Sequence, residues 1–172
     1  MFQTEEMVLY GHYGVCKIAD IRTELFGREK KCYYVLKPIE DATTTLYCPV
    51  ELGGKKFRQM LSRETICAMM DDLSECTDAW IAEDHARQEH FQEILRTGDQ
   101  AQILRMYRML YTHREHCRRT GRKFHAVDQK LMKEAEGMLC SEFSYVLQLR
   151  HDAVLPLLSG KTKLAEIRRA CR

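Results

Sequence analysis

The spacing of apolar residues changes about one third of the way along the chain. Up to residue 61 they form short runs separated by Gly, Pro and Asp, as in residues 7–10 (MVLY), 32–36 (CYYVL) and 44–49 (TTLYCP). Short runs rich in β-branched and aromatic residues predict antiparallel strands, here bent into a small barrel. Pro49 indicates an edge strand or the end of a strand, because proline has no N–H to donate.

From residue 62 onward apolar residues recur every three or four positions, which predicts helices. Ser62, Asp78 and Asp99 are the expected starts of successive helices, because short polar side chains cap the free N–H groups of a first turn. Gly98 and Gly121 are the expected ends, because glycine accepts the left-handed conformation that closes a helix.

A longer apolar stripe over residues 127–149 predicts a further helix, and Pro156 and Gly160 mark a short tail. The chain is therefore predicted to be α+β. Residues 1–62 form a β domain, and residues 63–172 form an all-α domain with a short C-terminal extension. Both parts are small, so each gains stability from packing against a neighbour or partner.

Composition narrows the class of protein. The 172 residues are 45% hydrophobic and 30% charged, which excludes a disordered tail, and no apolar run is long enough to span a membrane. The first six residues contain two acids and no basic residue, so no secretory signal is expected and the protein is predicted to be cytoplasmic. The eight cysteines form no CxxC pair, which favours scattered thiols over a zinc module or disulfides.

Positive charge is concentrated between residues 105 and 123. This stretch holds seven basic residues and one acid, Glu115, although the whole chain has a net charge of only +2. Arginine forks suit phosphate oxygens, so the stretch predicts a nucleic-acid contact; a solvated helix face paired with nearby glutamates is the alternative. The basic residues are Arg105, Arg108, Arg114, Arg118, Arg119, Arg122 and Lys123.

Two further features have more than one interpretation. Trp80, the single tryptophan, lies in an acidic segment and either packs in a small core or is exposed as a wedge that opens a duplex. His113, His116 and Cys117 could share a metal ion, but the positive charge around them opposes a cation and favours a polar helix face. No metal and no cofactor are therefore expected.

The sequence offers no catalytic motif. It contains no nucleophile elbow, P-loop, dinucleotide fingerprint or HExxH motif, and the residues 53–56 (GGKK) lack the spacing of a phosphate loop and predict a surface turn. A protein that binds rather than catalyses is therefore expected.

Several segments resemble, in order, those of the CarD family of bacterial transcription regulators, whose first module also occurs in transcription-repair coupling factor. Residues 7–15 (MVLYGHYGV) resemble the "VVYPxHGV" opening of that family, and residues 33–36 (YYVL) its "YYVL" strand. Further similar segments are residues 45–50 (TLYCPV), 58–64 (RQMLSRE), 95–99 (LRTGD), 103–114 and 130–139.

The resemblance implies a Tudor-like barrel that docks on the β subunit of bacterial RNA polymerase. It also implies a helical domain that contacts promoter DNA near the melted region and shifts the open-complex equilibrium without catalysis. Neither a membrane nor a small-molecule substrate is implied. The implied polymerase-binding residues are Glu24, Phe26, Leu46 and Tyr47, and the implied DNA-binding residues are Trp80, Arg87 and the seven basic residues of positions 105–123.

The chain departs from the family pattern at several of these positions. Gly11 replaces a proline, and Glu24 and Tyr47 stand where basic polymerase contacts are expected. The position of the wedge tryptophan falls at Asp84, so Trp80 lies about one helical turn early, and Arg87 alone remains of the basic residues that follow it.

Two other functions fit the sequence. A protein-only adaptor would use the barrel to bind a partner and the helices for assembly, without touching DNA. A thiol- or metal-dependent sensor would use Cys117 with His113 and His116.

Overall fold

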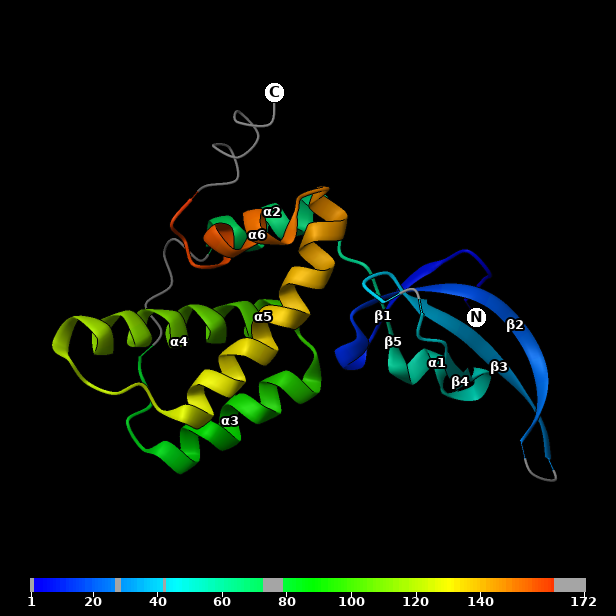
Figure 1. The fold of residues 1–172 in the computed structure, drawn as a ribbon, viewed down its shortest axis with the longest axis horizontal. Helices are drawn as coiled ribbons and strands as arrows, with labels where there is room; N and C mark the ends of the chain where they lie inside the picture. Colours follow the sequence, from blue (N-terminus) through cyan, green and yellow to red (C-terminus); the bar gives the residue numbers. More distant parts are fainter. Residues whose placement is uncertain (1, 27–28, 42, 73–78, 163–172) are drawn as a thin grey trace. The chain divides into compact units, whose positions relative to one another are not determined.

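The computed structural model describes residues 2–26, 29–41, 43–72 and 79–162, and it divides into two compact units, Met1–Leu61 and Ser62–Arg172. Each unit is described by itself (Figure 1). The first contains β1 (Met7–Tyr10), the 3-10 turn η1 (Gly11–Tyr13), β2 (Val15–Phe26), β3 (Glu29–Pro38), β4 (Leu46–Pro49), α1 (Val50–Lys56) and β5 (Phe57–Gln59). The second contains α2 (Arg63–Asp72), α3 (Asp84–Thr97), α4 (Gln100–Thr120), α5 (Ala126–Leu147) and α6 (His151–Leu158).

The first unit is built on an antiparallel sheet with the strand order β4-β3-β2-β1-β5. Strands followed by helices confirm the predicted α+β class. The sheet is not closed into the expected barrel: β4 and β5 are its two edges within the described residues, and each pairs with one neighbour. β4 has four residues and β5 has three, and no pairing joins the two within the described residues.

The hairpin of β2 and β3, the two longest strands, forms the central part of this sheet. Figure 1 shows it as a curved pair of strands. Its register shifts between Ile18 and Asp20, which is a bulge of the kind that bends a strand. Alternate residues point to opposite faces, so one face carries the core cluster, and the opposite face carries Leu9, Val15 and Val35, which are also buried. The buried core consists of Val8, Cys16, Ile18, Tyr34, Leu36, Cys48 and Phe57.

The short helix α1 was not predicted, because the residues 53–56 were interpreted as a surface turn. The helix packs against the sheet at Gly53, where a Cβ atom would lie 2.5 Å from Cε2 of the buried Tyr34. Glycine at this position is therefore required by the close approach of helix and ring rather than by an unusual backbone angle.

The substitution Gly53→Ala is expected to lower the free energy of unfolding by about 1 kcal/mol or more, because the added methyl overlaps the Tyr34 ring. Gly54→Ala in the same helix is the matched control, because a Cβ there meets nothing within 4 Å. Alanine favours a helix, so Gly54→Ala should leave stability unchanged or raise it. Urea denaturation of the two variants tests this difference, and equal behaviour would contradict it.

The second unit packs α3, α4 and α5 against one another, and most of the predicted helix ends are confirmed. The Ser62 hydroxyl accepts from the Thr65 N–H at 3.1 Å, immediately before α2. Asp99 caps α4, because its side chain accepts from the N–H groups of Ala101 and Gln102. Gly98 and Gly121 end α3 and α4 with φ angles of 72° and 66°.

The predicted start of the helix containing Phe91 was wrong. Asp78, the expected cap, lies outside the described residues, and α3 begins only at Asp84. The side chain of Glu83 accepts from the N–H groups of His85 and Ala86 and caps the helix there. Trp80 therefore precedes α3 instead of lying on it.

In the ranges described, no helix combines the length and apolar character needed to cross a membrane.

Candidate functional site

The outer face of the sheet carries a cluster of Arg22, Glu24, Tyr33 and Tyr47, named here the outer-face cluster. Arg22 and Tyr33 are directly opposite on β2 and β3, and Tyr47 on β4 is opposite Val35. Arg22 donates from Nη2 to the Tyr47 hydroxyl at 2.9 Å and lies 2.7 Å from Glu24 Oε1 through Nε. The rings of Tyr33 and Tyr47 meet edge to face with centroids 6.4 Å apart.

Two of the four expected polymerase contacts, Glu24 and Tyr47, thus meet through Arg22, which sequence reasoning did not select. Leu46 points the other way, since it packs against the buried core of the unit. Phe26 is the last residue of β2, and its side chain lies outside what the structure describes. Tyr47 is 39% exposed, so its aromatic ring is available to a partner.

Strand β4 lies at the edge of the sheet beside this cluster, because only β3 pairs with it in the described chain. An edge strand presents backbone N–H and C=O groups that a strand from another protein can bind. The first unit therefore offers a backbone edge next to an exposed aromatic and charged surface.

In the second unit, Trp80 is half-buried and held by two side chains. Its ring stacks on His113 of α4, with centroids 3.7 Å apart and an interplanar angle of 8°. The Arg87 guanidinium carbon lies 4.5 Å from the Trp80 ring centroid, as in a cation–π contact. The tryptophan therefore joins the loop before α3 to α4, and it is neither a fully buried core residue nor a free wedge.

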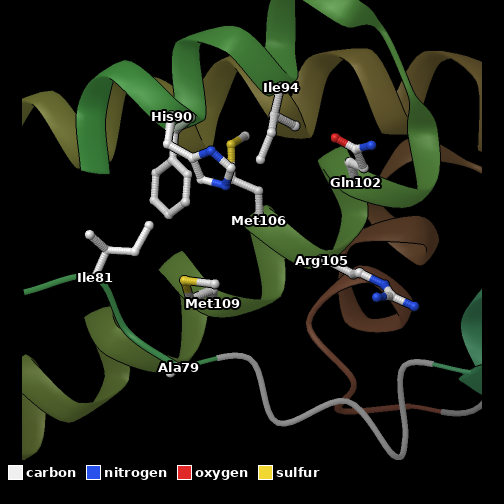
Figure 2. Close-up of a pocket in the computed structure, with 9 residues that line it drawn as sticks. Ala79, Ile81, His90, Ile94, Gln102, Arg105, Met106 and Met109 are labelled. Atoms are coloured by element: carbon white, nitrogen blue, oxygen red, sulfur yellow. The ribbon is translucent and has the colours of Figure 1, made fainter. Parts of the chain in front are cut away.

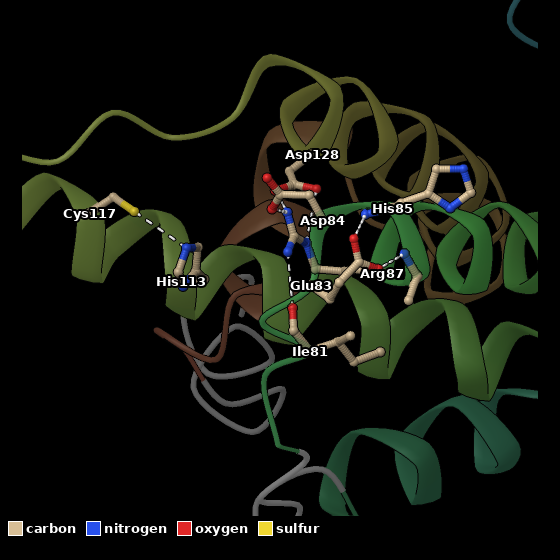
Figure 3. Close-up of polar contacts among 9 residues, drawn as sticks. Ile81, Glu83, Asp84, His85, Arg87, His113, Cys117 and Asp128 are labelled. Carbon is tan, nitrogen blue, oxygen red and sulfur yellow. Dashed lines mark hydrogen bonds and ion pairs between the residues drawn. The ribbon is translucent and has the colours of Figure 1, made fainter.

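Arg87 is only 2% exposed, so the structure places it in the interior and not on a phosphate-binding surface. It binds both carboxylate oxygens of Asp128 on α5, at 3.2 and 2.8 Å, and Asp84 at 2.6 Å. Its Nη1 donates to the Ile81 carbonyl at 2.9 Å (Figure 3). These bonds use the guanidinium to connect the Ile81 loop, α3 and α5.

Burial and the nearby charge of Arg87 lower the pKa of His113 below its usual value of 6.5. The folded chain therefore keeps this imidazole neutral at pH values where the unfolded chain protonates it. Stability associated with His113 should be complete above about pH 6.5 and should fall as the pH drops below it.

The measurement is a set of urea unfolding curves between pH 7.5 and 5.0, followed by the fluorescence of Trp80. His113→Gln should show a weaker loss of stability toward acid, because glutamine does not titrate. An identical pH dependence in both proteins would contradict the assignment to His113.

The basic residues of positions 105–123 do not share one face of α4. Arg114 follows Arg105 by about two and a half turns, so the two side chains leave opposite sides of the helix. Arg105 binds Asp72 at 2.7 Å, and Arg118 binds Glu115 at 3.0 Å. Carboxylates thus neutralise part of the charge that the sequence concentrates here.

The remaining basic residues lie in two places. Arg119, Arg122 and Lys123 are exposed at the end of α4 and in the loop that follows it. Arg108 and Arg114 lie three positions before and after Tyr111, and both are partly buried. Lys161, which follows α6, also approaches Tyr111; sequence reasoning missed it because it is far from the basic stretch.

The histidines and cysteine of α4 do not form a metal site. Cys117 Sγ lies 3.5 Å from His113 Nε2. The His113 ring also contacts the rings of Trp80 and Phe124. Within the described ranges no three His, Cys, Asp or Glu side chains are grouped so as to hold a metal ion.

A pocket of about 380 Å³ lies between α3, α4 and the loop before α3 (Figure 2). Its walls are mostly apolar, with Gln102, Arg105 and His90 among the polar members. The lining residues are Ala79, Ile81, His90, Phe91, Ile94, Gln102, Arg105, Met106 and Met109.

Comparison with known proteins gives one family match, restricted to the first unit. Residues 2–55 match the family model of the CarD-like/TRCF RID domain, a span that contains the outer-face cluster and strand β4. No curated protein matches the chain. The matched span does not reach the helical unit, so it concerns the sheet and α1 alone. Residues 2–55 are thus a CarD-like/TRCF RID domain, and this match supports an interaction of the first unit with RNA polymerase.

Proposed function

We propose that the protein is a transcription regulator that docks on the β subunit of bacterial RNA polymerase and holds promoter DNA, changing the stability of the open complex. The observation that carries the proposal is the domain match over residues 2–55, a span in which β4, among the described residues, is an edge strand that carries exposed Tyr47. The proposed activity is binding, and no reaction is assigned to the chain.

Docking would combine two kinds of contact. A strand of the β subunit adds to β4 through backbone hydrogen bonds, which give affinity with little dependence on sequence. The outer-face cluster adds specificity, because Tyr and Arg side chains supply much of the energy of protein interfaces. Glu24 and Tyr47 stand where the family has basic residues, so the partner surface is expected to accept a different charge pattern.

The DNA contact is assigned to Arg114, Arg118 and Arg119 together with the loop residues Arg122 and Lys123. The last four lie exposed at the C-terminal end of α4, where cations are also favoured by the helix dipole. Arg87 is left out because it is buried, and Trp80 is given no wedge role because His113 and Arg87 hold its ring.

Replacing Arg114, Arg118 and Arg119 with Ala is expected to weaken binding to promoter DNA and to lower its salt dependence. Each lost phosphate contact removes about 0.9 from the slope of log K against log salt concentration, so three contacts remove about 2.7. Fluorescence anisotropy with labelled duplex DNA at several salt concentrations measures the slope.

The matched control replaces three exposed basic residues elsewhere, Arg96, Lys133 and Arg150, and changes the net charge by the same amount. This control should keep most of the slope. Equal losses in the two triple variants would show that total charge, and not this surface, governs DNA binding.

A protein-only adaptor is the second candidate. It is favoured by the division of the arginines between two sides of α4 and by the carboxylate partners of Arg87, Arg105 and Arg118. Absence of duplex binding at low salt, together with retained binding to the polymerase β subunit, would select the adaptor.

A further inference from the structure

Three cationic side chains gather around Tyr111 of α4. The Arg114 guanidinium carbon lies 5.0 Å from the Tyr111 ring centroid, and Lys161 Nζ lies 5.4 Å from it. Arg108 precedes Tyr111 by three positions, so both side chains leave neighbouring parts of the helix surface. Its guanidinium lies against Gly160, where a Cβ atom would come 2.6 Å from Arg108 Cζ. Residues of α4 and of the turn after α6 therefore meet at one place.

These cations lack the carboxylate partners that other arginines of the unit have. Arg87, Arg105 and Arg118 each form an ion pair, whereas in the described part of the chain no carboxylate lies within ion-pair distance of Arg108, Arg114 or Lys161. An unpaired cluster of like charges repels itself, so it is stable only at some cost to the fold.

Arg108 is expected to contribute most of this unfavourable free energy, because its charged side chain is half-buried. Its Nε is shielded from solvent and has no hydrogen-bond partner among the described residues. Burial without a partner disfavours the charged form, and it lowers the pKa of Arg108 below its usual value. The Tyr111 hydroxyl, on a side chain 9% exposed, is also buried without a partner there. Both groups can donate a hydrogen bond, and their side chains are three positions apart on α4, so a bound anion could accept from them.

The acids of the neighbourhood are already engaged. Glu115 binds Arg118, and the Glu136 carboxylate accepts from the Tyr107 hydroxyl at 3.3 Å. Neither is bonded to the three cations, which leaves these cations able to bind an anion from outside the described chain. Two guanidinium groups and an ammonium suit a multiply charged tetrahedral anion better than a single carboxylate, because guanidinium forks match phosphate oxygens.

We propose that Arg108, Arg114 and Lys161 form a phosphate-binding site beside Tyr111. The phosphate belongs either to the DNA backbone, in which case the site deepens the proposed function, or to a free phosphate ester, in which case the site stands without it. Lys161 gives the turn after α6 a role that the CarD resemblance does not supply, because that resemblance ends near residue 150.

The test uses pyrophosphate as the probe and the full chain. Pyrophosphate should raise the unfolding temperature of the wild-type protein above that in sodium chloride of equal ionic strength, because a ligand of the folded state stabilises it. Lys161→Gln should weaken pyrophosphate binding by about tenfold or more, measured by calorimetry, since a contact to a charged group is lost. Lys133→Gln on α5 is the matched control and should bind as the wild type does, because Lys133 is exposed elsewhere.

A second variant separates a binding role from a structural one. Arg108→Met should keep or raise the unfolding temperature in chloride, because it removes a half-buried unpaired charge, while losing the response to pyrophosphate. The site is refuted if pyrophosphate does not stabilise the wild type beyond sodium chloride, or if Lys161→Gln and Arg108→Met respond as the wild type does.

Competition with short duplex DNA identifies the source of the phosphate. Displacement of pyrophosphate by DNA assigns the site to the DNA backbone. Binding of pyrophosphate that DNA does not displace assigns the site to a free phosphate ester, and this result also supports the site. Failure of DNA binding alone would therefore count against the proposed function and leave the pyrophosphate result to decide the site.

Discussion

Replacing Arg87 with Ala is expected to lower the free energy of unfolding by about 3–5 kcal/mol, because it leaves the buried carboxylate of Asp128 without its partner. The side chains of Arg87 and Asp128 are 2% and 1% exposed, so water cannot replace the lost bonds. The Ile81 carbonyl and the Trp80 ring would lose a contact as well. Urea denaturation at pH 7, followed by Trp80 fluorescence, measures the change.

Arg96→Ala is the control for this prediction. Arg96 forms a similar bidentate contact with Glu93 three positions away, but its side chain is 78% exposed, so its loss should cost far less stability than the loss of Arg87. The double variant Arg87→Ala with Asp128→Ala should be less destabilised than the sum of the two single variants. Additive effects, or a cost for Arg87→Ala no larger than that for Arg96→Ala, would contradict the buried ion pair.

Tyr47→Ala is expected to weaken binding of the chain to the polymerase β subunit by about thirtyfold, which corresponds to about 2 kcal/mol for an aromatic residue central to an interface. Tyr47 is exposed on the edge strand β4, and its hydroxyl accepts from Arg22, so its removal also frees the guanidinium that orients Glu24. Calorimetric titration of the full chain with the isolated β subunit measures the affinity.

Tyr145→Ala is the matched control, because Tyr145 of α5 is 36% exposed, close to the 39% of Tyr47, but lies in the helical unit. It should bind the β subunit as the wild type does. Because both tyrosines are on the surface, both variants should keep the wild-type unfolding temperature. Equal affinities of the two variants would remove the outer-face cluster from the interface.

Local signals in the sequence predicted much of the fold. Ser62, Asp99, Gly98 and Gly121 each act within one helical turn, and the structure confirms their capping roles. The change of apolar spacing near residue 61 likewise predicted strands before helices. These features depend on neighbours in the chain, which is why a single sequence is enough to find them.

The partners of the arginines could not be predicted, because they depend on residues distant in sequence. Asp128 is 41 positions from Arg87, and nothing near Arg87 marks it as buried. Helix α1 was missed because two glycines favour a turn, while the reason for Gly53 is the ring of Tyr34 from another element. The open sheet was not predicted, because apolar spacing locates strands but does not determine which strands pair at the edges.

The polymerase contacts implied by the family resemblance include both correct and incorrect placements. The family resemblance pointed to Glu24 and Tyr47, which the structure brings together. It also pointed to Leu46, although strand alternation turns adjacent residues to opposite faces, and this residue packs against the core. Arg22, which joins the other two, could have been found from its position two residues before Glu24 on the same face of β2.

Association of the full chain with the isolated β subunit of bacterial RNA polymerase tests the central claim most directly. Size-exclusion chromatography at low salt is predicted to show the two proteins eluting together, with the complex lost or sharply weakened for Tyr47→Ala and kept for Tyr145→Ala. Separate elution of the wild-type chain and the β subunit under these conditions would contradict the claim.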